Sequence, residues 1–331
     1  MIRTILTAAA LTTCAIAAQA QSPTLTVYTY DSFVTEWGPG PVIEEAFEAE
    51  CACQLEFVAA GAGAALLARL QLEGARSDAD IVLGLDTTLT AQAAETGLFV
   101  PHGVTPEGLT LPIAWEDPPN LPYDWGHFAF VYDRTLLEDA PDSFEALLAA
   151  EDLSIVIQDP RSSTPGLGLL MWVKAVYGDR APEVWEALAP RIVTVTKGWS
   201  EAYGLFLEGE ADMVLSYTTS PANHLIAEED PTIAAANFSD GHYMQIEVAG
   251  MLGSSDQPEL ARQFLDFMLS PGFQDVIPTT NWMYPAALPP EELPAGYETM
   301  IRPETSLLFP AADVPAIKEE ALAEWLAALS Q

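Results

Sequence analysis

The sequence predicts an α/β fold, in which helices cover sheets of largely parallel strands. Short apolar runs that suit buried strands recur along the chain, and between most of them lie runs with apolar residues three and four positions apart. Such alternation of strand and helix is typical of α/β proteins. The length of 331 residues indicates two domains, because one domain usually holds about 100 to 200 residues.

The predicted elements follow one another in a regular order. Strands are expected at residues 24–30, 53–59, 79–85, 127–133, 153–159, 192–196, 212–218 and 245–252. Helices are expected at residues 41–50, 63–73, 143–152, 182–189 and 259–269, and two more are expected to start near Pro165 and at Ser200. A last helix, at residues 313–330, carries an apolar stripe that suits packing on the outside of one domain.

Residues 1–20 have the features of a secretory signal peptide. Arg3 is the positive start, residues 5–18 are an apolar run, and A-Q-A is a small-x-small cleavage site. The run is shorter than the roughly 20 apolar residues that a membrane span requires. Cys14 lies inside this run instead of after the cleavage site, which argues against a lipoprotein. We therefore expect a soluble, exported mature chain that starts near Gln21.

The charge is strongly negative, with 12 Lys and Arg against 48 Asp and Glu and a formal net charge of -36. Nucleic acid and anionic membranes are therefore poor partners. One explanation of the charge is a solvated acidic surface suited to salty surroundings. The other is a field that attracts a cationic ligand.

Cys51 and Cys53 are the cysteines that follow the signal peptide. Export to an oxidising compartment favours a disulfide between them. A soft-metal site and a redox pair are the alternatives, but no further Cys and no clustered His accompanies the two thiols. We expect the disulfide and no metal.

Aromatic and hydroxyl side chains are concentrated where the predicted strands end, which is where open α/β sheets bind ligands. These segments are YDSF (30–33), GLD (84–86), QDPRSSTPG (158–166), KGWS (197–200), SYTTSP (216–221) and, on a later loop, NWMYP (281–285). Trp and Tyr faces attract a desolvated cation, by about 2 kcal/mol each at best, and stack on planar rings. The pattern therefore predicts a flat, positively charged heteroaromatic ligand.

The loop before the helix near Pro165 suits an anion or another acceptor. Ser163 or Thr164 is expected to cap this helix, with Pro165 in its first turn. Free backbone N–H groups at its start would seat a phosphate, and ordinary capping with nothing bound is the alternative. Arg161 and Lys197 flank these loops. The chain has only 12 basic residues, so two of them beside these loops favour an anionic group there.

No catalytic signature is present in the sequence. It has no phosphate-binding loop and no H-E-x-x-H, and G-W-S-E-A around Ser200 lacks the second glycine of a nucleophile elbow. Ser200 is instead expected to cap the helix that follows it. The four histidines are scattered singly at His102, His127, His224 and His242. We therefore expect a binding protein and not an enzyme.

Eight segments together resemble the bacterial periplasmic thiamine-binding proteins, the substrate-capturing subunits of ABC importers. They are TVYTYDSF, WGPGP, VLGLD, QDPRSSTPGLGLL, VTVTKGWSEAYGLF, LSYTTSPA, AANFSDGHY and NWMYP, and the resemblance extends from about Thr24 to Trp325. It implies a type II periplasmic binding protein fold, with two α/β lobes that close on the ligand by a hinge motion. Residues 22–123 plus 240–300 would form lobe 1, residues 124–239 lobe 2, and residues 301–331 a C-terminal helical segment.

The resemblance also implies a ligand and partners. The transported ligand would be thiamine, thiamine monophosphate or thiamine diphosphate, with no cofactor. The protein would act as a monomer and deliver the vitamin to an inner-membrane ABC permease driven by its ATPase. Because local donors outweigh a field screened within about 8 Å, we expect thiamine and its monophosphate to bind comparably.

The site residues are carried over by position from the same resemblance. Tyr30, Trp199, Tyr217 and Trp282 match the aromatic positions around the ligand rings; Ser163 and Thr164 match contacts on the phosphate or hydroxyethyl side; Thr218, Thr219, Ser220 and Pro221 match a strand-end loop; and Gly63 keeps its place. The family has an acidic pair before this glycine, whereas this chain has Ala62. Asp31 or Asp86 is the expected substitute, because each follows or ends a predicted strand.

Two other functions share this fold. A thiamine-degrading transferase would require a Cys nucleophile, and Cys51 and Cys53 are far in sequence from the strand-end loops. A ferric-ion-binding protein would use adjacent tyrosines, but Tyr217 is followed by Thr218 and Thr219. Both remain alternatives to thiamine capture.

Overall fold

The structure is a computed structural model that describes residues 22–329. The predicted signal peptide, residues 1–20, lies outside this range. Within it, no helix is both long and apolar enough to cross a membrane.

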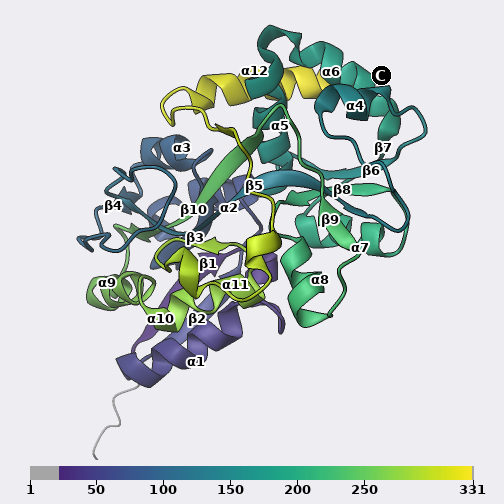
Figure 1. Ribbon diagram of the computed structural model, residues 1–331. Coiled ribbons are helices and arrows are strands. Elements are labelled where there is room, and N and C mark those ends of the chain that lie inside the picture. Colours follow the sequence, from purple (N-terminus) through teal and green to yellow (C-terminus); the bar gives the residue numbers. More distant parts are fainter. Residues whose placement is uncertain (1–21, 330–331) are drawn as a thin grey trace, which may run out of the picture.

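All eight predicted strands form. They are β1 (Thr24–Thr29), β2 (Gln54–Ala59), β3 (Ile81–Asp86), β5 (Asn120–Asp133), β6 (Ile155–Gln158), β7 (Ile192–Thr196), β8 (Met213–Tyr217) and β10 (His242–Leu252). Their hydrogen-bonded order is β2-β1-β3-β10-β5-β8-β6-β7, as can be followed in Figure 1. The short strands β4 (Phe99–Val100) and β12 (Ser306–Leu307) pair with β10, and β9 (Ile233–Ala235) and β11 (Tyr284–Pro285) pair with β5.

The expectation of largely parallel strands holds only for the outer ones. β1 is parallel to β2 and β3, and β6 is parallel to β7 and β8. The central strands β5 and β10 are antiparallel to each other and to their other long neighbours. The first half of β5 was missed because Pro122 and Gly126 weaken its strand pattern; Pro122 is accommodated where the pairing with β10 shifts register.

β5 and β10 connect the two halves of the molecule. Residues 120–127 of β5 pair with β10, whereas residues 128–133 pair with β8 and β9. Figure 1 shows one half around β1, β2 and β3 and the other around β6, β7 and β8, with β5 and β10 between them.

All eight predicted helices also form. These are α1 (Gly40–Cys51), α2 (Ala64–Glu73), α4 (Phe144–Ala149), α5 (Thr164–Tyr177), α6 (Ala181–Leu188), α7 (Trp199–Leu207), α9 (Pro258–Phe267) and α12 (Val314–Leu329). The sequence did not predict α3 (Thr90–Glu95), α8 (Pro221–Ala227), α10 (Pro271–Gln274) and α11 (Ile277–Thr280), all of which are short. Short 3₁₀ helices lie at Asp31–Val34, Gly74–Arg76, Gly178–Arg180, Ala189–Arg191, Pro290–Glu292 and Tyr297–Thr299.

The last helix, α12, packs on the outside of the second half, as expected. The buried Lys174 Nζ of α5 pairs with Glu324 at 2.8 Å and with Glu320 at 3.0 Å, both on α12. This contact leaves the Lys174 charge compensated under the helix. α12 lies across the top of Figure 1, away from β1 and β2.

The expected disulfide is present between Cys51 and Cys53, at the end of α1. Ala52 between them adopts a left-handed backbone, with φ 53. Cys53 is buried at the edge of an apolar cluster that includes Phe47. The bridge therefore closes the turn from α1 into β2.

Candidate functional site

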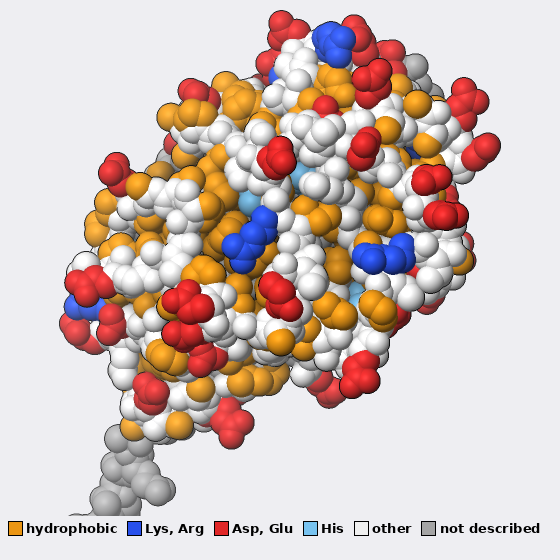
Figure 2. All heavy atoms as spheres, in the orientation of Figure 1, with side chains coloured by type: hydrophobic (Ala, Val, Ile, Leu, Met, Phe, Trp, Pro, Cys, Tyr) orange, Lys and Arg blue, Asp and Glu red, His pale blue; other side chains and the backbone are white. Residues whose placement is uncertain are grey.

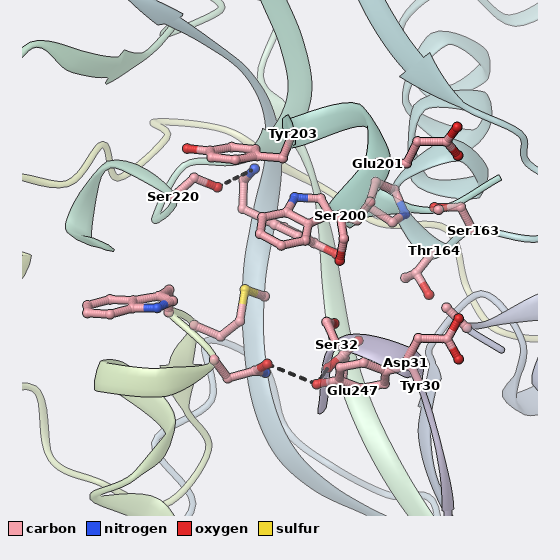
Figure 3. A pocket seen from close by; sticks show the side chains of 18 of the residues that line it. Tyr30, Asp31, Ser32, Ser163, Thr164, Ser200, Glu201, Tyr203, Ser220 and Glu247 are labelled. Atoms are coloured by element: carbon pink, nitrogen blue, oxygen red, sulfur yellow. Dashed lines mark hydrogen bonds between the residues drawn. The ribbon is translucent and has the colours of Figure 1, made fainter. Parts of the chain in front are cut away.

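A cavity of about 310 Å³ lies between the two halves, at the ends of the strands. Its walls come from segments far apart in the sequence, including the ends of β1 and β8, the N-termini of α5 and α7, and the loop at Asn281. Figure 3 shows Tyr203 and Ser220 on one side of it, and Tyr30 and Glu247 on the other. The strand-end loops that the sequence singled out thus meet at one place.

Seven of the predicted site residues line this cavity: Tyr30, Ser163, Thr164, Trp199, Tyr217, Ser220 and Trp282. Four do not line it: Gly63, Thr218, Thr219 and Pro221. The loop after β8 turns inward, so Thr218 and Thr219 are fully buried, and Thr219 Oγ1 lies 3.7 Å from the sulfur of Met283. Pro221 is the first residue of α8 and faces the interior.

Gly63 stands behind the cavity wall and has a steric role there. Its backbone is left-handed, with φ +47, and a Cβ at this position would lie 2.6 Å from Thr164 Oγ1. Gly63 belongs to the first half and Thr164 begins α5 in the second. The glycine therefore lets the two halves approach each other beside the cavity.

Trp199 is held in place as one wall of the cavity. Its Nε1 donates a hydrogen bond to Ser216 Oγ at 2.7 Å, and its ring stacks on Tyr203 with centroids 4.9 Å apart. The Tyr203 hydroxyl is 2.9 Å from His224 Nε2. These contacts fix the orientation of an indole that is only half-buried. Ser200 does not cap α7 as predicted, because the helix already begins at Trp199, with Gly198 as its N-cap.

Ser163 also departs from its predicted capping role. It is the N-cap residue of α5, but its side chain makes no capping hydrogen bond. Its Oγ is buried and has no hydrogen-bond partner among the described residues, although Ser163 lines the cavity. The hydroxyl is therefore free for a ligand. The first N–H groups of a helix also lack intrahelical partners, so this end of the cavity offers hydrogen-bond donors.

The two basic residues near these loops differ in position. Lys197 lines the cavity and is exposed. Arg161 does not line it, and its guanidinium instead forms an ion pair with Asp159. Only one of the two positive charges is therefore placed to attract an anionic group into the cavity.

The sequence missed a buried acid in the cavity wall. Glu247, on β10, lines the cavity and is 6% exposed. It accepts hydrogen bonds from the hydroxyls of Tyr123, at 2.7 Å, and Tyr30, at 3.3 Å. Gln245, two residues earlier, lines the same wall. The sequence did contain a signal for this acid. Gln245 and Glu247 are polar residues at alternate positions of an apolar strand, and alternate residues lie on the same face of a sheet.

Of the two acids predicted to replace the family's carboxylate, only Asp31 lines the cavity. Asp86 is fully buried outside the cavity wall, where Thr88 Oγ1 donates a hydrogen bond to it at 2.6 Å. Burial raises the pKa of Asp86 to about 6. The side chain is therefore not placed to contact a ligand, and the hypothesis for Asp86 is corrected.

Two further tryptophans, Trp37 and Trp282, line the cavity. Trp37, which the sequence did not assign to the site, is 53% exposed and lies 6.4 Å from Trp199 between ring centroids. Trp282 has a left-handed backbone with φ 58. This conformation is uncommon for a bulky residue and is found where surrounding structure enforces it, often at functional sites.

The profile of the bacterial extracellular solute-binding proteins matches residues 35–275 of this chain. The chain belongs to this family. It is 54% identical to the thiamine-binding periplasmic protein of Escherichia coli (strain K12), over 93% of this chain and 94% of that protein. It is 50% identical to the protein of the same name from Brucella suis biovar 1 (strain 1330), over 95% and 94% of the two chains.

The solved structures agree with this assignment. A structure described as a periplasmic thiamin binding protein superposes on this solute-binding protein with a TM-score of 0.92, at 53% sequence identity, and covers 94% of this chain and 97% of the other. The fold is therefore the type II periplasmic binding protein fold, and the protein is periplasmic. The relatives are named as binding proteins and not as enzymes.

The residues of this solute-binding protein also bear on the two alternative functions. Cys51 and Cys53 form a disulfide and do not line the cavity, so neither is placed as a nucleophile there. Within residues 22–329, no group of three or more His, Cys, Asp or Glu side chains is placed to hold a metal ion. The cavity is suited to binding by aromatic rings and hydrogen bonds.

Proposed function

We propose that this protein captures thiamine and its phosphates in the periplasm and delivers them to an ABC importer. The observation that carries the proposal is a cavity lined by tyrosine and tryptophan from both halves, with a buried carboxylate in its wall. Relatives at 50% and 54% identity are named as thiamine-binding proteins, which supports the same ligand.

The rings of thiamine suit the aromatic walls. The thiazolium is a quaternary cation with no N–H donor, so it gains more from aromatic faces than from any single hydrogen bond. Trp199 and Tyr217 lie on the side of the second half, and Tyr30 and Trp282 approach from other segments. We assign these four rings to stacking against the two heterocycles of the vitamin.

The hydroxyethyl or phosphate group suits the N-terminus of α5. Ser163 Oγ is buried and unpartnered within the described residues, and Thr164 lines the same corner. Helix N-termini favour anions, and Lys197 adds a positive charge near the cavity. These groups would donate hydrogen bonds to a phosphate. The acidic surface would repel the same phosphate at long range. In Figure 2, acidic side chains outnumber basic ones on the visible face.

The protein is proposed to act as a monomer with an inner-membrane permease and its ATPase. Lobe boundaries near residues 123 and 240 are also proposed, from the resemblance to the thiamine-binding proteins. β5 (Asn120–Asp133) passes through the first boundary, and β10 begins at His242, next to the second. Hinge closure about these two strands would bring the cavity walls onto the ligand.

Calorimetric titration of the purified mature protein tests this function. Thiamine and thiamine monophosphate are expected to bind saturably with one site, whereas choline and a free aminopyrimidine are expected to bind far more weakly. Choline tests whether a quaternary cation alone suffices, and the aminopyrimidine tests the second ring alone. No heat of binding with thiamine or either phosphate would overturn the proposal.

A further inference from the structure

Three buried carboxyl groups occupy one row across the sheet below the cavity. Glu247 on β10 pairs in register with Asp86 on β3 and with Asp124 on β5. All three are at most 6% exposed. Paired positions on neighbouring strands bring side chains within interaction distance, so three acids at this position are costly unless protons or cations compensate them.

Glu247 and Asp124 form the closest pair of this row. Asn281 Nδ2 donates to Asp124 Oδ2 at 2.6 Å, and the other oxygen, Oδ1, is buried without a hydrogen-bond partner among residues 22–329. Burial raises the pKa of both acids, and the neighbouring charge of Glu247 raises the pKa of Asp124 further. The pair is thus built to hold at least one proton.

Glu247 is the member of the pair that faces the cavity. It lines the wall, whereas Asp124 does not. Next to it, Gln245 lines the cavity with a fully buried side chain, and neither of its amide atoms has a hydrogen-bond partner among the described residues. A buried amide whose N–H and C=O groups make no hydrogen bond lowers the stability of the protein. A ligand that hydrogen-bonds to the amide would remove this penalty. The Glu247 wall is therefore incomplete without a polar, cationic occupant.

We propose that Glu247 is the counter-charge of the ligand's cationic ring, and that binding the cation displaces a proton from the Glu247–Asp124 pair. The proposal rests on the proposed function, and it adds a specificity determinant and a proton linkage to that function.

The groups that face Glu247 are known from every strand around it. They are Asp86 from β3, Asp124 and Tyr123 from β5, Tyr30 from the end of β1, and Tyr217 from β8. Lys318 lies near Asp86 and not in the cavity wall. No cation among the described residues is recorded beside Glu247 itself, so a bound quaternary ring would be its first positive neighbour.

The direction of the linkage follows from charge. Burial raises the pKa of Glu247 to about 7, so at pH 7 about half of the empty protein carries a proton there. A cation beside the carboxylate favours the charged form and lowers this pKa. Binding then releases about half a proton per ligand at pH 7, and affinity rises about tenfold from pH 6 to pH 8.

The test is calorimetry of the full mature protein with thiamine, between pH 6 and pH 8, in two buffers with different ionisation heats. The variants are Glu247→Gln and Glu56→Gln. Glu56 is an exposed residue of β2 outside the cavity, so it matches the change in charge without touching the site. The neutral 3-deaza analogue of thiamine, which keeps the shape of the ring without its charge, is titrated in parallel.

The expected result is proton release and a rise in affinity with pH for the wild type and Glu56→Gln. Glu247→Gln is expected to show neither, and to bind thiamine about tenfold more weakly at pH 8 while binding the neutral analogue no worse. The absence of proton release by the wild type would overturn the proposal even if Glu247→Gln fails to fold. Thiamine binding without proton release or pH dependence would overturn this inference and leave the proposed function intact. Absence of thiamine binding would overturn the function itself.

Discussion

Gly63 and Thr164 contact each other across the boundary between the two halves, where a Cβ on Gly63 would lie 2.6 Å from Thr164 Oγ1. This contact sits directly behind the wall that Thr164 contributes to the cavity. A side chain at position 63 would hold the two halves apart at the point where they must close on a ligand.

Gly63→Ala is therefore expected to weaken thiamine binding by at least about tenfold, because closure is coupled to the geometry of the site. It is also expected to lower the free energy of unfolding by about 1 kcal/mol, since alanine is strained at positive φ. Gly97→Ala is the matched control: Gly97 has φ +65, and a Cβ there meets nothing within 4 Å. Equal loss of affinity in both variants would contradict a steric role for Gly63.

Ser216→Ala is expected to loosen the Trp199 wall. It removes the acceptor of the 2.7 Å hydrogen bond from the indole Nε1 and leaves the stacking on Tyr203 in place. One such hydrogen bond contributes about 1 kcal/mol, so thiamine affinity should fall by about fivefold. The measurement is an equilibrium titration, with thermal unfolding as a check on folding. An unchanged affinity would show that stacking alone orients the indole.

Ser163→Ala is expected to weaken thiamine monophosphate and thiamine by similar small factors. The serine Oγ is buried without a partner among the described residues, so either a phosphate or the hydroxyethyl group would use it. The wild type is expected to bind thiamine and its monophosphate comparably, because Lys197 and the start of α5 balance the acidic surface. A hundredfold preference of the wild type for either ligand would contradict this assignment.

The stability of the ligand-free protein is expected to fall as pH rises from about 5 to 8. The folded-state pKa of Glu247 is raised to about 7 by burial, so its contribution is present at low pH and is lost as pH rises through that value. Thermal unfolding should show a pH slope in the wild type and Glu56→Gln that is reduced in Glu247→Gln. The same pH slope in the wild type and in both variants would contradict a contribution of Glu247 to the pH dependence of stability.

The sequence predicted the strand ends well, because each apolar run is bounded by polar and aromatic residues. It failed where a local pattern was overruled by its surroundings. Because Pro122 weakens the strand pattern, the first half of β5 was not predicted. Pro221 was assigned to a loop, but it begins α8. Glu247 was missed because a carboxylate inside an apolar strand reveals its role only when the neighbouring strands are known.

The walls of the site were predictable, but the polar residues behind them were not. Trp199 follows a strand and Tyr217 ends one, so their positions in the sequence already placed them at the ligand edge of the sheet. Thr218 and Thr219 share that position but turn inward, which depends on how the loop packs on Met283. The partners of Tyr30 come from residues 217 and 251 positions away, a separation that no local pattern encodes.

Thiamine is proposed to bind in this cavity against Trp199. The measurement that tests this proposal most directly is the tryptophan fluorescence of the wild type and of Trp199→Ala during titration with thiamine. Saturable quenching at submicromolar thiamine is expected in the wild type, and a binding curve shifted by at least about tenfold is expected in the variant. Identical curves for the two proteins, or no response of the wild type to thiamine, would contradict the proposal.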